Sequence, residues 1–367
     1  MPEINDIMSQ LQQFDWESFL SILRPIIITY ITPKAYGIYR LYKDFVPAKI
    51  NKASMPPELL PDTSKIDINR ISVVPFRDSV IEFANLITEK FPQEYLMNFY
   101  NNISNVKINK KNFTIINFYT SPLSAEKFSG YYNPRRNLIS INCNSTIVPI
   151  YHELFHMAST IYKNGNIYSG FSQSRRSNSM GDGINEGYTQ LLSERYFGDI
   201  EGVKGTYPYI TILVKELENI VGKEKMESLY FNANLLGLIE ELKQYFSEED
   251  ISKLISGFDF ILRHMNDKVM LPFEKEKLIS SAKDTMELLF MGNIKKIKKE
   301  FPDELDPDFL MELNNYLHLD FALIPVEIFI GKERYKVMTI EKMQELLQAT
   351  LNSIEISLKA KDDSKSK

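Results

Sequence analysis

Residues 147–158 read Ile-Val-Pro-Ile-Tyr-His-Glu-Leu-Phe-His-Met-Ala, and His152, Glu153 and His156 form the pattern H-E-x-x-H within them. Residues four apart lie one above the other on the same helix face, so both imidazoles can be directed at one metal ion. Glu153, next to the first histidine, would then face a water molecule at that ion. The chain has four histidines in 367 residues, and two are here. The spacing therefore predicts a metal-binding helix.

The residues around this pattern predict that the helix is buried. Apolar side chains occupy most positions from 147 to 162, as is typical of a helix covered on nearly all sides. The alternative, two core histidines with a stray glutamate, would leave Glu153 buried without a partner, which is costly. Proline fits only the first turn of a helix. Pro149 therefore places His152 close to the start of the helix.

A second helix downstream offers a third ligand, because a catalytic zinc ion usually takes three protein ligands. Residues 183–197 have helical spacing, with Asp182 as a possible cap and Glu186 near the start. With Asn185-Glu186 following H-E-x-x-H, the stretch 128–197 resembles the gluzincin metallopeptidases, zincins whose second helix supplies a glutamate within an Asn-Glu pair. The resemblance implies that His152, His156 and Glu186 hold one Zn²⁺ ion per chain and that Glu153 is the general base.

Gln190 departs from the pattern of the thermolysin-like members, which have an aspartate four residues after the ligand glutamate. Because Gln190 follows Glu186 by four residues, both side chains lie on one helix face. The amide oxygen of Gln190 can still accept a hydrogen bond from a ligand imidazole. We therefore predict that Gln190 does not bind the metal ion itself but orients an imidazole that does. Glu194 is the alternative third ligand on this helix.

Two further segments flank the predicted metal helices. Residues 128–142 read as a strand, a turn at 133–136 and a second strand. The resemblance implies that an extended peptide pairs with the edge of this hairpin, and the alternative is a purely structural hairpin. Residues 163–183 are rich in Gly, Ser and Asn. They predict a long loop, either a rim over the cleft or a solvated surface loop.

The whole chain is predicted to be an α+β protein with a zincin-like core, made of a small mixed sheet and two metal-binding helices, and a mostly helical C-terminal lobe. The predicted parts are an extension with linker at 1–62, the core at 63–205, the helical lobe at 206–358 and a disordered tail at 359–367. Further predicted elements are helices at 78–90, 93–103 and 340–358, a strand at 113–119, and a hairpin of 326–330 with 335–338.

The resemblance also concerns the second lobe, because gluzincins often take a Tyr or His from it to stabilise the oxyanion. His264, Tyr207 and Tyr209 are the candidates in this chain. The alternative for each is an ordinary packing or surface residue of its helix.

Composition excludes several other classes of function. A net charge of −5 without a basic stripe does not predict nucleic-acid binding, and a single cysteine, Cys143, permits no internal disulfide. The N-terminus lacks the basic start of a secretory signal, and the apolar stretch 19–31 is broken by Arg24 and Pro25 and is too short for a transmembrane segment. We therefore expect a cytoplasmic protein. Residues 19–42 are expected to dock on the main body, with peripheral membrane contact as the alternative.

These observations together predict a zinc-dependent peptidase that acts on peptide or protein substrates. Endopeptidase action is preferred because no motif for anchoring a free amino terminus is present. Two alternatives stay open: a catalytically silent zincin-fold protein with a binding or regulatory role, and a zinc hydrolase that acts on a non-peptide amide or ester. The intact Glu153 argues against the first, because a purely structural zinc ion needs no neighbouring base.

Overall fold

The computed structural model describes residues 74–111, 129–142, 149–163, 165–175, 178–200, 203, 207–265, 270–302, 307–321, 326–330 and 333–350. All of them belong to one compact unit that runs from Pro47 to Lys367. The predictions for 1–62, including membrane contact by 19–42, and those for Cys143, the strand at 113–119 and the tail at 359–367 lie outside the described residues.

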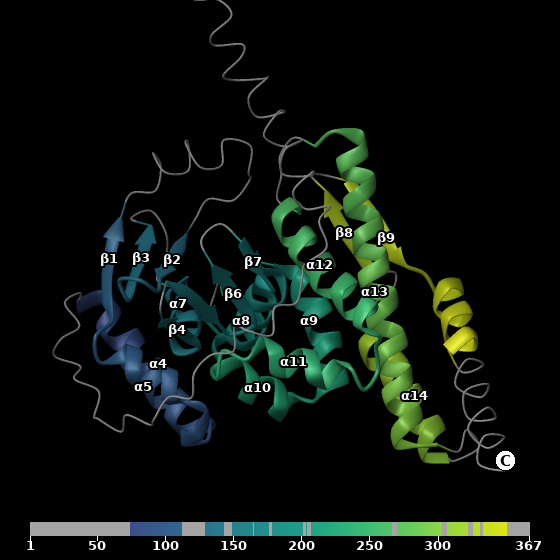
Figure 1. The fold of residues 1–367 in the computed structure, drawn as a ribbon, viewed down its shortest axis with the longest axis horizontal. Helices are drawn as coiled ribbons and strands as arrows, with labels where there is room; N and C mark the ends of the chain where they lie inside the picture. The colour runs from purple at the N-terminus through teal and green to yellow at the C-terminus, as the bar shows by residue number, and fades with distance from the viewer. Residues whose placement is uncertain are drawn as a thin grey trace, which may run out of the picture. The chain divides into compact units, whose positions relative to one another are not determined.

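The first described part is a small mixed sheet with helices beside it (Figure 1). Its elements are α4 (Val74–Lys90), the 3-10 turn η4 (Gln93–Tyr95), α5 (Met97–Ile103), β1 (Lys107–Lys111), β2 (Gly130–Asn133) and β3 (Leu138–Asn142). The strand order is β1-β3-β2. β1 is parallel to β3, and β2 is antiparallel to it. The predicted hairpin is thereby confirmed, whereas the predicted helix 93–103 is divided into η4 and α5.

The two helices that carry the metal-binding pattern are α7 (Pro149–Ala158) and α8 (Asp182–Phe197). Pro149 is the first residue of α7, as its missing amide proton requires. α7 packs against β2, β3, α4, α5 and α8. Aromatic rings fill the junction, where Phe155 of α7 lies 4.9 Å from Phe83 of α4 and Phe83 stacks on Phe197 of α8 at 5.9 Å. This packing fixes the two helices relative to the sheet.

The segment between α7 and α8 is an antiparallel sheet, so the prediction of a long loop at 163–183 was wrong. Its strands are β4 (Thr160–Lys163), β5 (Asn166–Ser169), β6 (Ser172–Arg175) and β7 (Asn178–Met180), in the order β4-β5-β6-β7. Gly165 and Gly170 make the tight turns, with φ of 79° and 52°. Glycine adopts such angles without steric cost. The strands are too short and polar to show the alternation by which strands are predicted.

Helices form most of the remainder, together with one late hairpin. The elements are α9 (Pro208–Val221), α10 (Lys223–Phe231), α11 (Leu235–Leu242), α12 (Glu248–His264), α13 (Pro272–Glu300), α14 (Pro307–Phe321), β8 (Val326–Ile330) and β9 (Glu333–Met338). Residues 340–350 are again helical. The antiparallel pairing of β8 with β9 confirms the predicted hairpin, and the chain has the predicted α+β composition.

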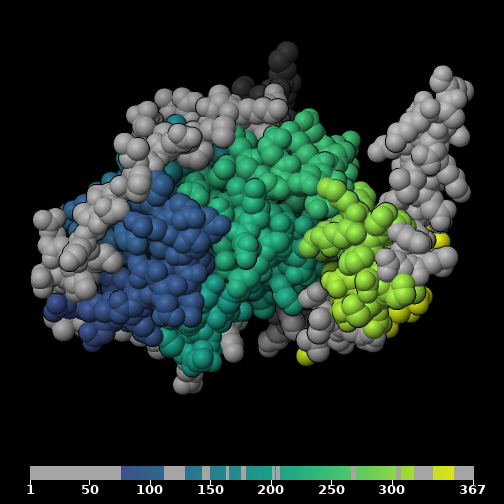
Figure 2. Space-filling model, turned by 90° about the horizontal axis from the view of Figure 1, so that it is seen from below, coloured from purple at the N-terminus to yellow at the C-terminus, as the bar shows by residue number. Residues whose placement is uncertain are grey.

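The helical part packs directly on α8, since α9 and α12 both contact that helix. It also reaches the N-terminal helices through contacts of α10 with α5 and η4. Figure 2 shows atoms of the N-terminal helices, in blue, lying against those of the central helices, in green. Within the described residues, no helix is both long enough and apolar enough to cross a bilayer.

Candidate metal centre

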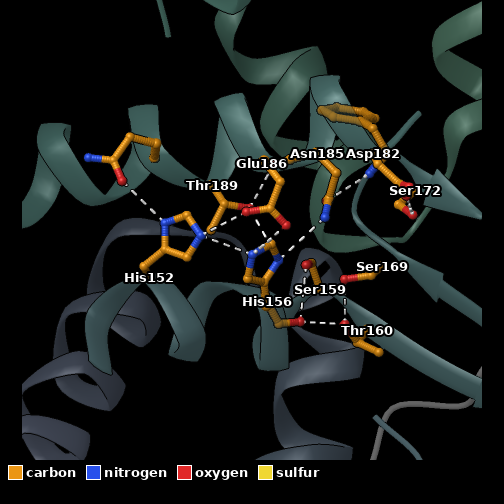
Figure 3. Close-up of polar contacts among 12 residues, drawn as sticks. His152, His156, Ser159, Thr160, Ser169, Ser172, Asp182, Asn185, Glu186 and Thr189 are labelled. Atoms are coloured by element: carbon orange, nitrogen blue, oxygen red, sulfur yellow. Dashed lines mark hydrogen bonds and ion pairs between the residues drawn. The ribbon is translucent and has the colours of Figure 1, made fainter. Parts of the chain in front are cut away.

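Three side chains from α7 and α8 direct their ligating atoms at one point (Figure 3). His152 Nε2 lies 3.2 Å from Glu186 Oε2, and His156 Nε2 lies 3.3 Å from Glu186 Oε1. The two Nε2 atoms are 3.0 Å apart. Two imidazole nitrogens and a carboxylate that converge in this way form a donor set for a divalent cation.

The size of this cluster fits zinc. Bonds of about 2.0–2.2 Å in a tetrahedral arrangement separate neighbouring ligand atoms by about 3.3 Å. The two Nε2 atoms are 3.0 Å apart, and each lies 3.2 or 3.3 Å from a different oxygen of the Glu186 carboxylate. With one atom taken from each residue, the ligating atoms lie within 4.8 Å of one another, so the three side chains could hold one zinc ion.

The electrostatics of Glu186 favour its ionised form. Burial by itself would raise the pKa of Glu186, but the imidazoles of His156 and His152 hold that pKa well below its usual range. A ligand carboxylate must be deprotonated to bind a metal ion. Glu186 is therefore a carboxylate ready for coordination.

Glu153 lies on α7 in a different environment. It is buried, and burial raises its pKa to about 7. The His152 imidazole and a hydrogen bond from the backbone of Tyr132 lower this pKa, whereas the charge of Glu186 raises it further. Gly130 of β2 lies directly against it, because a Cβ added there would be 2.9 Å from Glu153 Oε1. Glycine at this position therefore makes room for the carboxylate.

The ring nitrogen of His152 that faces away from the cluster contacts Gln190, the residue for which the sequence predicts this role. His152 Nδ1 lies 3.2 Å from Gln190 Oε1. Gln190 Nε2 donates to Glu194 Oε1 at 2.9 Å and to Val203 O at 2.7 Å. These two bonds orient the amide so that its oxygen faces the imidazole. Glu194 thus contacts Gln190 and is not part of the ligand cluster.

The start of α8 is held by a residue that the sequence did not reveal. Asp259 of α12 accepts hydrogen bonds from Gly181 N at 2.9 Å and Gly183 N at 2.8 Å. Asp182, the predicted cap, is the first residue of the helix and accepts from Ser172 Oγ at 2.5 Å instead. The prediction of Asp182 as the cap was wrong because the cap comes from another helix. No local pattern could have pointed to Asp259, which lies about one-fifth of the chain downstream.

The three candidates for stabilising an oxyanion lie in different surroundings. The hydroxyl of Tyr209 is buried and donates to Ala282 O at 2.9 Å, which commits it to the packing of α9 on α13. His264 is buried at the end of α12, with its ring 4.5 Å from that of Phe260. The half-buried Tyr207 has its ring 6.1 Å from that of His152. Tyr207 is therefore the candidate that lies beside a ligand.

Comparison of the chain with protein-family models, with curated proteins and with solved structures finds no match. The residues of the site and their geometry are therefore the basis of the function proposed below.

Proposed function

We propose that this protein is a zinc-dependent peptidase in which His152, His156 and Glu186 bind the zinc ion and Glu153 is the general base. The observation that carries the proposal is the convergence of three ligating atoms within 4.8 Å of one another. A buried carboxylate from the same helix accompanies them. A structural site usually has four protein ligands, whereas three protein ligands leave a position for water.

The chemistry follows from the two kinds of carboxylate in the site. A zinc ion held by the three ligands would supply Lewis acidity, which lowers the pKa of a water molecule and polarises a substrate carbonyl. Glu153 would accept a proton from that water as its oxygen attacks the carbonyl carbon. When the C–N bond breaks, Glu153 would return the proton to the leaving amine. A pKa of about 7 suits a group that both takes and returns a proton near neutral pH.

The position of β2 supports a peptide as the substrate. Among the described strands, β2 pairs only with β3 and forms the edge of its sheet. The backbone of such an edge can pair with an extended peptide whatever the peptide's side chains are. Gly130, which lies against Glu153, is the first residue of β2. A peptide paired with β2 would therefore pass next to the base.

Tyr207 is the residue that we assign to the substrate carbonyl. Its ring lies beside that of His152 and at the start of α9. A phenol hydroxyl can donate to an oxyanion, and the loss of one such donor typically costs about 100- to 1,000-fold in turnover.

Cleavage of a peptide library tests the proposal. The purified protein should cleave peptides, a chelator should abolish cleavage, and added zinc should restore it. Glu153→Gln keeps the shape of the side chain but cannot accept a proton, so turnover should fall by roughly two to four orders of magnitude. Two outcomes would reject the proposal: bound zinc without any hydrolysis, which indicates a binding protein, and hydrolysis only of small esters or non-peptide amides.

A further inference from the structure

The second ligand histidine needs a hydrogen-bond acceptor behind it. His156 Nε2 faces the ligand cluster, so a neutral imidazole that binds metal through this atom carries its proton on Nδ1. Metal-binding histidines almost always donate this proton to a neighbouring oxygen, which fixes the ring. For His152 the acceptor is Gln190. The acceptor for His156 has to be found among different residues.

Asn185 is close to His156 but presents the wrong atom. Its Nδ2 lies 3.3 Å from His156 Nδ1, and an amide nitrogen donates hydrogen bonds without accepting them. The opposite atom, Asn185 Oδ1, accepts a hydrogen bond from Phe171 N at 3.2 Å. This bond to the backbone keeps the oxygen turned away from the imidazole.

Thr189 presents an oxygen to the same ring nitrogen. Its Oγ1 lies 3.4 Å from His156 Nδ1, and it donates its own proton to Asn185 O at 2.7 Å. The third neighbour of Oγ1 is the hydroxyl of Tyr230, also at 2.7 Å. A hydroxyl has one proton and two lone pairs. Donation to Asn185 O leaves one lone pair for the Tyr230 proton and one for the His156 proton.

Tyr230 connects this arrangement to the helical part of the protein. It comes from α10, is fully buried, and has a pKa raised above its usual range by burial. It therefore stays protonated and can donate to Thr189. Ser159, directly after α7, also interacts with the Tyr230 hydroxyl, and its own hydroxyl donates to His156 O at 3.3 Å. Figure 3 shows Thr189 and Ser159 on either side of His156.

We propose that Thr189, oriented by Tyr230, is the positioning residue for His156. The amide of Gln190 then holds the His152 imidazole, and a relay of two hydroxyls, from Tyr230 to Thr189, holds the His156 imidazole. This inference rests on the proposed zinc site. It assigns to α10 a direct part in the geometry of a metal centre whose ligands all come from α7 and α8. Neither Thr189 nor Tyr230 belongs to the ligand cluster itself.

Zinc affinity, measured by competition with a chromophoric chelator, tests this inference. Thr189→Val keeps the shape of the side chain but removes the acceptor, and should weaken zinc binding roughly 10- to 100-fold. Thr189→Ser restores the hydroxyl and should bring the affinity back to within about threefold of the parent. Tyr230→Phe leaves Thr189 in place but frees its rotation, so we expect a smaller loss of about three- to tenfold. Circular dichroism of each variant checks folding.

Thr350→Val is the matched control, because Thr350 is also buried and its hydroxyl makes the same type of helical bond, to Leu346 O at 2.7 Å. It should bind zinc like the parent. Equal affinity of Thr189→Val and the parent would overturn the inference, as would an equal loss in Thr189→Ser or in the control. If Thr189→Val does not fold, Thr189→Ser and Tyr230→Phe decide: a loss confined to Tyr230→Phe supports the relay, and no loss overturns it. A parent that binds no zinc would refute the proposed function instead.

Discussion

Mutation of Glu186 and mutation of Glu153 are expected to have different effects on zinc content, because only Glu186 belongs to the ligand cluster. Glu186→Ala removes a metal bond and should strip most of the zinc together with the activity. Glu153→Gln should keep near-stoichiometric zinc while turnover falls. Metal analysis of both purified variants measures the difference. If Glu186→Ala retains zinc as the parent does, the third ligand lies elsewhere and the assignment of Glu186 is wrong.

Gln190 should affect zinc binding without touching the ion. Gln190→Ala removes the acceptor that faces His152 Nδ1 and should weaken zinc binding roughly 10- to 100-fold. Competition with a chelator measures the change. Ser193→Ala on the same helix is the control, since the Ser193 hydroxyl donates to the backbone oxygen of Thr189 within that helix. Unchanged affinity in Gln190→Ala would mean that this amide does not orient the ligand.

Gly130 should matter for turnover more than for stability. In Gly130→Ala the new Cβ would lie 2.9 Å from Glu153 Oε1 and 3.0 Å from its Cγ, so the carboxylate must move. Small displacements of a reacting group can cost about 100-fold in rate. We expect turnover to fall roughly 10- to 100-fold, with zinc content unchanged and unfolding shifted by no more than about 1 kcal/mol. Retained turnover would show that the base tolerates the displacement.

The contact between α8 and α12 is expected to make stability depend on pH. Burial, and then the charge of Asp182, raise the pKa of Asp259 to about 7. The hydrogen bonds from the amides of Gly183 and Gly181 and the charge of Arg263 lower this pKa and only partly offset the rise. The folded protein therefore binds this proton more tightly than the unfolded chain does, whose carboxyl has a pKa near 3.8. Protonated Asp259 therefore contributes to the free energy of unfolding. This contribution is complete below about pH 4 and is lost as the pH rises through 7.

Asp259→Asn should remove this dependence. The free energy of unfolding of the parent, relative to that of the variant, should decrease by up to about 3 kcal/mol between pH 5 and 8. Urea unfolding of the zinc-free proteins at several pH values measures it, and the absence of zinc removes the pH dependence of metal binding. A difference between parent and variant that does not change with pH would contradict the assignment.

Removal of the metal should lower the stability of the entire compact unit, because the ligands join α7 to α8 and α8 is packed on α9 and α12. An ion that binds only the folded state stabilises it by about 4 kcal/mol when the free concentration is 1,000 times the dissociation constant. The melting temperature should therefore rise with added zinc and fall with a chelator. Glu186→Ala should show neither change. A parent whose melting temperature ignores both additions would contradict a zinc site.

Predictions from the sequence succeeded where the decisive contacts are local. The helix α7 and the β2–β3 hairpin were predicted from spacing, because residues four apart share a helix face and alternating residues share a strand face. The segment 163–183 was mispredicted, since the stability of its short polar strands comes from their pairing with one another and not from their own composition.

The local geometry of one helix already brings His152, Glu153 and His156 together, and the same rule aligns Glu186 with Gln190. The packing of α8 against α7 decided that Glu186 and His156 would meet, and distant helices decided which side chains support them. Asp259 from α12 and Tyr230 from α10 reach the site only in the folded chain. Such contacts form between side chains of separate helices that meet in space. The helical period within one segment therefore does not predict them.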